Sequence, residues 1–152
     1  MKERSIVDWK IEVVTIPVSD VERARDFYSE KLGFNVDIDM AVGDGVRLVQ
    51  LTPPGSACSI HLSKPGMGME TGSIVGVFLV VPDVIAARAE LGERGVEVGE
   101  IQVFDDGAYR LAREGESLDN VGCVFFEDPD GNRWTVQQIP ARDDSDKQKA
   151  DG

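Results

Sequence analysis

The residue with the widest chemical scope in this sequence is His61, the only histidine among 152 residues. It lies in the segment CSIHLS, where Ser59 and Ser63 stand two positions away on either side. An imidazole can transfer a proton or hydrogen-bond a ligand, and a serine beside it is a candidate nucleophile. A catalytic dyad also needs a carboxylate partner, and the sequence identifies none within reach. Three roles therefore stay open for His61: contact with a ligand, acid–base catalysis, or structure without function.

Other reactive groups are sparse. Cys58 and Cys123 each stand alone in an apolar, strand-like run, which predicts reduced, buried thiols rather than a disulfide or a metal site. The sequence contains no G-x-S-x-G or C-x-x-C motif, and its Asp-rich segments lack the spacing of an EF-hand. No established catalytic signature is therefore present.

The chain is strongly acidic, with 28 acidic against 16 basic residues and a formal net charge of −12. Such a surface repels phosphate backbones, so we expect no nucleic-acid partner, and it attracts cationic small molecules. No apolar run is long enough to span a membrane. Because the N-terminus, MKERSIVDWKIE, is too charged for a signal peptide, we expect a cytoplasmic protein.

The elements that must position His61 occur twice. The first set has a strand at 11–20, a helix at 21–32 that ends at Gly33, and strands at 34–40, 46–53 and 58–63. The second set has a strand at 76–83, a helix at 83–95, and strands at 96–104, 121–128 and 132–139, with a loop at 105–120. Asp20 and Asp83 stand before the two helices, 63 residues apart, and Ser19 with Glu22 has the spacing of a capping box. Each half is thus predicted to have the order βαβββ.

Two βαβββ modules predict an α+β protein in which two curved, mixed sheets form a cup and helices cover the convex faces. We expect a polar N-terminal segment at 1–9, one domain at 10–140 and a disordered acidic tail at 141–152. Within the domain, module one covers about 10–63, a linker 64–73, and module two about 74–140.

Alternation along the strands separates core residues from cup residues. In the first strand Val14, Ile16 and Val18 are predicted to face the helix, and Thr15 faces the cup. In the strand at 76–83 Phe78 is expected to face the cup. Its ring could stack on a flat ligand there or could simply fill the core. Trp134 alternates to the helix side.

The segments VVTIPVSDVERARDFYSEKLGF and FEDPDGNRWTVQQ, taken together, resemble the vicinal oxygen chelate superfamily. This superfamily includes glyoxalase I, bleomycin-resistance proteins and extradiol dioxygenases. The resemblance covers about residues 10–140 and rests on the V-S-D strand end, the F-Y pair on the helix, the L-G-F exit and the D-P-D-G-N turn. It implies paired βαβββ modules around a cup, in agreement with the repeat.

Metal-using members of this family bind a divalent cation through His or Glu at four strand positions. By the resemblance these positions correspond here to Val13, His61, Gly76 and Thr135, of which only His61 has a ligating side chain. Since a catalytic metal needs about three protein ligands, we expect no metal, no cofactor and no assigned catalytic residue.

The resemblance therefore implies a metal-free, small-molecule-binding protein of the bleomycin-resistance kind. We expect a homodimer that sequesters a cationic or aromatic ligand, such as an antibiotic. The candidate ligand-binding residues are Thr15, Arg47, Ser59, His61, Phe78, Thr135 and Gln137. The loop 105–120 is a candidate lid over the cup. Two alternatives stay open: a metal-dependent lyase, isomerase or dioxygenase of glyoxalase type, and a structural or interaction protein whose cup is filled by side chains.

Overall fold

The structure, a computed structural model, describes residues 7–65 and 67–140. Its first module forms a four-stranded sheet, sheet A, in the spatial order β1-β4-β3-β2. The strands are β1 (Val13–Pro17), β2 (Asn35–Gly43), β3 (Val46–Thr52) and β4 (Ser59–Ser63). Between β1 and β2 the chain forms helix α1 (Val21–Asp26), which continues as a wider π-helical turn, η1 (Phe27–Lys31). The predicted βαβββ order is confirmed for this half.

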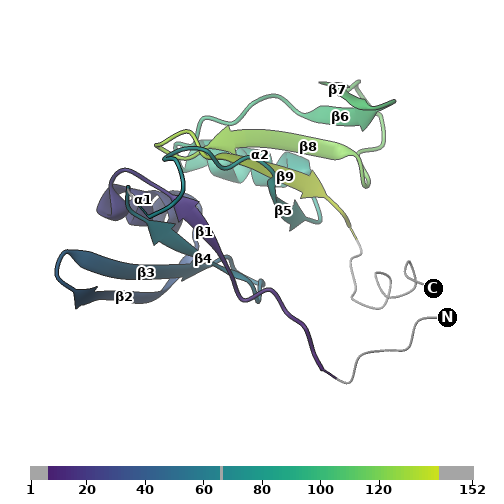
Figure 1. The fold of residues 1–152 in the computed structure, drawn as a ribbon. Helices are drawn as coiled ribbons and strands as arrows, with labels where there is room; N and C mark the ends of the chain where they lie inside the picture. Colours follow the sequence, from purple (N-terminus) through teal and green to yellow (C-terminus); the bar gives the residue numbers. More distant parts are fainter. Residues whose placement is uncertain (1–6, 66, 141–152) are drawn as a thin grey trace.

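The second module forms sheet B, which has five strands in the order β5-β9-β8-β6-β7. Its elements are β5 (Val77–Val81), α2 (Val84–Glu93), β6 (Gln102–Asp105), β7 (Ala108–Leu111), β8 (Gly122–Glu127) and β9 (Arg133–Gln138). Both sheets are mixed, since β1 pairs with β4 and β5 with β9 in parallel while their other pairs are antiparallel. The α+β fold with two mixed sheets is confirmed, and Figure 1 shows sheet A at lower left and sheet B at upper right.

One predicted loop is partly wrong. Residues 105–120 were expected to form a single long connection, but β6 and β7 pair as a hairpin within it. Asp106 and Gly107 make its tight turn, with φ angles of 51° and 83°. A two-residue turn with positive φ at both positions matches the twist of antiparallel strands, and Asp-Gly is a favoured pair for it. The second module thus has one strand more than the first.

Both helices begin in the same way. The carboxylate of Asp20 accepts a hydrogen bond from the Arg23 amide at 3.0 Å, and that of Asp83 accepts from the Ala86 amide at 3.0 Å. The capping role predicted for Ser19 is wrong, because Asp20 occupies the cap and Ser19 donates instead to the carboxylate of Asp130. Equivalent aspartate caps support the internal repeat.

The helix-side faces of the two sheets share one buried core. Trp134 on β9 is 1% exposed, and its ring lies 5.6 Å from that of Tyr28 and 6.0 Å from that of Phe34. Its predicted packing on the helix side is confirmed. From sheet A the core receives Ile16, Val49, Leu51, Ile60 and Leu62, and from sheet B Val124, Phe126, Trp134 and Val136. The opposite face of each sheet therefore points away from this core, and we call these two surfaces the outer faces.

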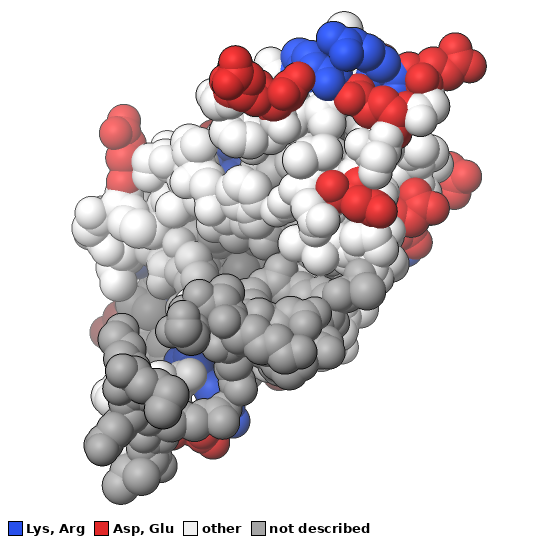
Figure 2. Space-filling view, turned by 90° about the vertical axis from the view of Figure 1, so that its right-hand side faces the viewer, with Lys and Arg blue, Asp and Glu red and all other residues white. Residues whose placement is uncertain are grey.

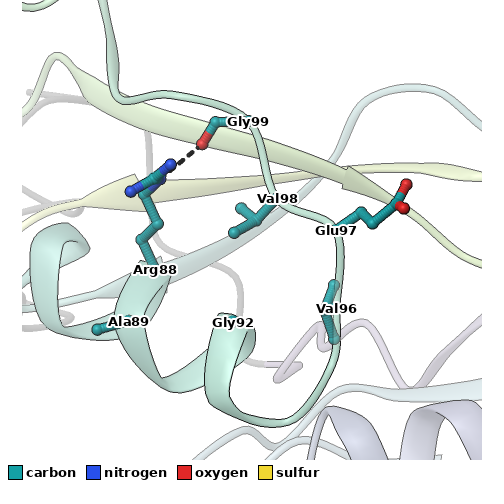
Figure 3. Close-up of a pocket in the computed structure, with 7 residues that line it drawn as sticks. All are labelled: Arg88, Ala89, Gly92, Val96, Glu97, Val98 and Gly99. Atoms are coloured by element: carbon teal, nitrogen blue, oxygen red, sulfur yellow. Dashed lines mark hydrogen bonds between the residues drawn. The ribbon is translucent and has the colours of Figure 1, made fainter.

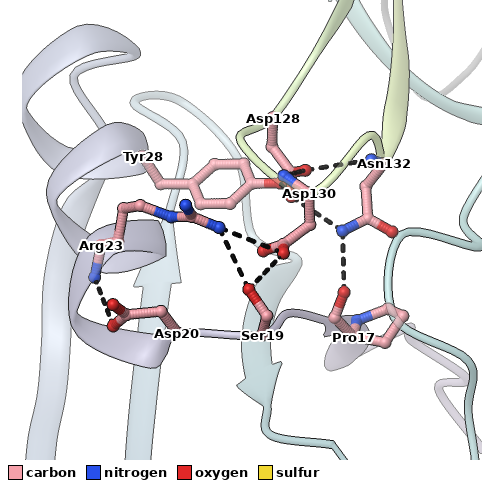
Figure 4. A network of polar contacts seen from close by, with 8 residues as sticks. All are labelled: Pro17, Ser19, Asp20, Arg23, Tyr28, Asp128, Asp130 and Asn132. Atoms are coloured by element: carbon pink, nitrogen blue, oxygen red, sulfur yellow. Dashed lines mark hydrogen bonds and ion pairs between the residues drawn. The ribbon is translucent and has the colours of Figure 1, made fainter.

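A buried polar clamp joins the turn between β8 and β9 to the first module (Figure 4). The carboxylate of Asp128 accepts from the Tyr28 hydroxyl at 2.7 Å and from the Asn132 amide at 2.8 Å. The Asn132 amide also donates to the carbonyl oxygen of Pro17 at 2.8 Å, and the Trp134 indole donates to the Tyr28 hydroxyl at 2.9 Å. Burial, with the charge of Asp128 and the hydrogen bond to it, raises the pKa of Tyr28 far above its usual range. The D-P-D-G-N turn thus has a structural task in holding the modules together.

Both cysteines are free thiols. Cys123 is buried as predicted, and burial raises the pKa of its thiol, whereas Cys58 is only half-buried. Among the described residues, neither helix has the length and apolar character needed to cross a membrane. The predictions for the tail 141–152 and for most of the segment 1–9 lie outside the described residues.

Candidate ligand-binding site

The outer face of sheet A brings three of the predicted site residues together. His61 on β4 is the register partner of Thr15 on the parallel strand β1 and of Gln50 on the antiparallel strand β3. Ser59 lies two positions before His61 and therefore on the same face. Thr15 is exposed, His61 is half-buried, and Ser59 is buried. A cavity of about 340 Å³ lies beside His61 and Thr15, with Leu48 and Met67 among its other lining residues.

A continuous set of hydrogen bonds crosses this face, and we call it the polar strip (Asp37, Gln50, Thr52, Ser59 and His61). The His61 Nε2 atom lies 2.9 Å from the Gln50 Oε1 atom. The Gln50 amide nitrogen lies 3.3 Å from an Asp37 carboxylate oxygen and 3.4 Å from the Ser59 hydroxyl. The hydroxyls of Thr52 and Ser59 are 2.7 Å apart, and Thr52 also bonds Asp37. His61 is thus connected to a carboxylate through one glutamine.

Asp37 is a site residue that sequence reasoning missed. Hydrogen bonds donated by Thr52, by Asn35 and by Gln50 hold the pKa of its carboxyl below the usual value. The pairing of β2 with β3 shifts register between Val36 and Ile38, which brings the Asp37 carboxylate to the His61 side. A simple alternation count gives no sign of this bulge, so the sequence offered no direct signal for Asp37.

Arg47 lines the same cavity as Thr15 and His61. Its guanidinium makes two hydrogen bonds to the Asp39 carboxylate, at 2.7 and 2.8 Å. Asp39 also accepts from Arg25 of α1 at 2.7 Å, so this group lies on the helix side of sheet A. The hydrogen bonds from Arg47 and then from Arg25 hold the pKa of Asp39 far below its usual value. Arg47 shares its face of β3 with the fully buried Val49, although it also lines the cavity beside His61.

The outer face of sheet B carries the other predicted residues and is aromatic. Phe78 on β5 pairs in register with Thr135 on β9, which in turn pairs with Phe125 on β8. Thr135 is 4% exposed, whereas Phe78, on the same face, is 51% exposed. The side chain of Gln137, also on this face, donates to the Asn120 carbonyl oxygen at 2.8 Å. Thr135 is therefore buried between two phenylalanines, and the Gln137 amide is already hydrogen-bonded within the chain.

The β6–β7 hairpin extends this surface with residues that sequence reasoning did not include. Phe104 and Tyr109 are register partners with ring centroids 5.1 Å apart, and they are 48% and 40% exposed. The Tyr109 ring also meets the edge of Phe125 at 5.1 Å, and the Arg133 guanidinium lies 4.3 Å from the centre of the Phe125 ring. The Asp-Gly pair at 106–107 is the signal that would have identified this hairpin. We call Phe78, Phe104, Tyr109 and Phe125 the aromatic surface.

The two outer faces do not close on each other within one chain. The sequence led us to expect a single cup lined by both His61 and Thr135, with the pairing of the modules left open. In the structure the helix-side faces of both sheets share the core, so the polar strip and the aromatic surface point away from it. Any cup that uses both surfaces therefore requires a second copy of the chain.

Another cavity, of about 600 Å³, lies between α2 and residues 96–99 (Figure 3). Its one basic side chain, Arg88, donates to the Gly99 carbonyl oxygen at 2.8 Å and pairs with Glu100 at 3.4 Å. Most of its remaining lining is small or aliphatic, including Ala89, Gly92 and Val96. This hollow is open to solvent, whereas the smaller cavity beside His61 is more enclosed and mostly apolar, so the latter is the better candidate for a specific site.

The residues do not fit the metal site that the family resemblance implies. Of the four corresponding positions, Val13 and Gly76 have no donor atom in their side chains, and Thr135 offers only a hydroxyl. Within the described ranges 7–65 and 67–140, no three His, Cys, Asp or Glu side chains cluster in a way that could hold a metal ion. His61 alone does not make a catalytic metal centre.

Comparison with known proteins identifies the family. A sequence profile of the Glyoxalase/Bleomycin resistance protein/Dioxygenase superfamily matches residues 10–136. The uncharacterized protein YetH of Bacillus subtilis (strain 168) is 24% identical over 132 residues, which cover 85% of this chain and 98% of YetH.

Solved structures agree. TnmS3, an antibiotic binding protein from Streptomyces sp. CB03234, is 31% identical with a TM-score of 0.68, over 89% of this chain and 99% of TnmS3. A glyoxalase/bleomycin resistance protein from the same organism is 32% identical with a TM-score of 0.64, over 85% and 100% of the two chains. This chain therefore belongs to the Glyoxalase/Bleomycin resistance protein/Dioxygenase superfamily.

Proposed function

We propose that this protein binds a small aromatic or cationic molecule, without a metal, and thereby sequesters it. The observation that carries the proposal is the aromatic surface, where Phe78, Phe104 and Tyr109 are each at least 40% exposed although they lie on a regular sheet. Rings held open on a rigid sheet suit stacking on a flat ligand. The similarity to the antibiotic binding protein TnmS3 supports an antibiotic as one such ligand.

The charge distribution supports a cationic ligand. The net charge of −12 attracts cations from solution, and Asp37 adds an ionised carboxylate beside His61. Figure 2 shows an uncharged region in the upper half of one side of the molecule, with basic residues at its upper end and acidic residues around its upper and right-hand rim. The acidic residues of this rim add to the attraction of a cation.

A homodimer is the second part of this proposal, because one chain does not bring its two outer faces together. Among the residues that the structure describes, β1 is paired only with β4 and β5 only with β9. Such open edges are sites at which another strand can pair. A two-fold dimer that joins sheet A of one copy to sheet B of the other places a polar strip opposite an aromatic surface, twice.

The experiment is a thermal-shift screen of cationic antibiotics and aromatic metabolites, followed by calorimetric titration of each hit. A ligand at 100 times its Kd stabilises the fold by about 2.7 kcal/mol, which is readily measured. Elemental analysis accompanies it, since stoichiometric Zn, Ni, Fe or Mn that survives chelation would favour a glyoxalase-type enzyme. Absence of any hit from a broad panel would favour a structural or interaction protein.

A further inference from the structure

One carboxylate sets the direction of the hydrogen bonds in the polar strip. The Asp37 oxygens receive the Asn35 amide at 2.8 Å, the Gln50 amide at 3.3 Å and the Thr52 hydroxyl. An ionised carboxylate can only accept. Each of these three neighbours must therefore turn a proton toward Asp37.

The donor and acceptor roles of the Thr52 and Ser59 hydroxyls are then fixed. Because Thr52 gives its only proton to Asp37, the 2.7 Å contact between Thr52 and Ser59 requires Ser59 to be the donor. Ser59 has now used its own proton, so its oxygen accepts from the Gln50 amide nitrogen at 3.4 Å. Both partners of that nitrogen, Asp37 and Ser59, are thus acceptors.

The orientation of the Gln50 amide determines which nitrogen of His61 carries a proton. Its amide nitrogen points to Asp37 and Ser59, so its carbonyl oxygen faces the His61 ring, 2.9 Å from Nε2. A carbonyl oxygen can only accept, so Nε2 must carry a proton. In a neutral imidazole the other nitrogen, Nδ1, then has a free lone pair. No other described residue hydrogen-bonds Nδ1, and His61 lines the cavity of about 340 Å³.

We propose that His61 Nδ1 is a hydrogen-bond acceptor that selects ligands presenting a donor, either a hydroxyl or an ammonium group. Asp37 is the positioning residue, since it fixes the ring's tautomer through Gln50 without touching the ligand. This inference rests on the proposed ligand-binding function and specifies the class of ligand. A site that keeps an acceptor ready discriminates against a ligand whose donor has been methylated, because the acceptor then loses its partner.

The tautomer is measured by long-range ¹H–¹⁵N NMR, at pH values where the imidazole is neutral. The spectrum has a single imidazole to assign, because His61 is the only histidine. The native protein should show the Nε2–H form. Asp37→Asn should show a mixture, because an asparagine can donate as well as accept and lets the Gln50 amide turn around. Asp44→Asn removes the same charge from the exposed turn between β2 and β3 and should leave the Nε2–H form intact. An unchanged tautomer in Asp37→Asn would overturn the role of Asp37.

Selectivity is measured with matched probes. We expect 2-naphthol to bind roughly 2- to 12-fold more tightly than 2-methoxynaphthalene, the range of one net hydrogen bond. A second pair, 2-naphthylmethylammonium and its N,N,N-trimethyl derivative, removes the donors while keeping the charge. Asp37→Asn should reduce the preference in whichever pair shows it, and Asp44→Asn should keep it.

The outcomes separate the inference from the function. Equal binding within both pairs contradicts the donor selection and leaves the proposed aromatic ligand site standing. If none of the four probes binds, the proposed function loses its support and the donor selection falls with it. Preference in the naphthol pair alone identifies a hydroxyl ligand, and preference in the ammonium pair alone identifies an ammonium ligand.

Discussion

The outer faces of the two sheets differ in chemistry although the two modules repeat the same opening, a strand followed by an aspartate-capped helix. Sheet A presents a polar strip whose side chains bond one another from Asp37 to His61. Sheet B presents an aromatic surface with Phe78 and Phe104 about half exposed. One half is thus suited to directional hydrogen bonds and the other to stacking. The repeat fixes where each surface lies, and the residues at alternate positions decide what it can recognise.

The helix-side faces, by contrast, are alike, and this explains why the outer faces can differ. Both contribute apolar side chains to one core, and the clamp around Asp128 ties the two modules together. Stability is concentrated on this side, so changes on the outer faces should affect ligand affinity more than folding.

The largest effect is expected from the clamp. Tyr28→Phe removes the donor to Asp128 and leaves the buried Trp134 indole without its acceptor. We expect a loss of about 2–3 kcal/mol, or roughly 5–10 °C in Tm for a domain of this size. The matched control is Tyr109→Phe on the aromatic surface, which should cost under about 0.5 kcal/mol. Equal losses in a denaturant titration would show that stability is not concentrated on the helix side.

The next largest effect concerns the aromatic surface. Phe78→Ala should weaken an aromatic ligand about tenfold, or about 1.4 kcal/mol, while Tm changes little because the ring is half exposed. Ile85→Ala on α2 removes a side chain that is 58% exposed, away from this surface, and should leave affinity unchanged. Calorimetric titration distinguishes the two variants. Equal losses of affinity in Phe78→Ala and Ile85→Ala would indicate a general effect of shortening an apolar side chain.

The polar strip should contribute less. His61→Ala removes one hydrogen-bonding group, which corresponds to about 0.5–1.5 kcal/mol, or roughly 2- to 12-fold in affinity. Affinity is measured on the same ligand and compared with that of Phe78→Ala. Unchanged affinity for His61→Ala would remove His61 from the site and leave only the aromatic half.

The smallest effect is expected from Asp39, which lies on β2 two positions after Asp37 but faces the opposite side of sheet A. Asp39 faces the helix side, where Arg47 and Arg25 lower its folded-state pKa, so its contribution to stability is present above about pH 4, the unfolded value. The contribution is lost as pH falls through the lower folded-state pKa. Asp39→Asn should therefore destabilise the protein at pH 7, and its stability should converge with that of the native protein in acid. Thermal unfolding across pH measures this, and a constant difference at all pH values would contradict it.

The sequence predicted the parts of this molecule that depend on periodicity. Alternation placed Trp134 on the helix side and Phe78 on the other, and the structure agrees. The same rule places Arg47 with the apolar positions 49 and 51, on the helix side of β3. Because Arg47 also lines the cavity beside His61 while it bonds Asp39, its contact with a ligand stays a prediction.

Other features depend on geometry that a periodic pattern does not contain. The bulge in β2 that turns Asp37 toward His61 is a local register shift, set by pairing with β3. The orientation of the two sheets is set by how the rings around Trp134 pack. Neither strand periodicity nor the repeat specifies that packing, so the sequence left open whether the modules pair within one chain or across a dimer.

The most direct test of the central proposal is complementation between two damaged copies. His61→Ala and Phe78→Ala are purified separately, then mixed under conditions that exchange subunits, and ligand titration counts the sites of native affinity. If sheet A of one copy meets sheet B of the other, each mixed dimer regains one intact site, and random equimolar mixing restores about a quarter of all sites. If no site of native affinity appears although mixed dimers form, the binding site does not span two chains and the proposal is contradicted.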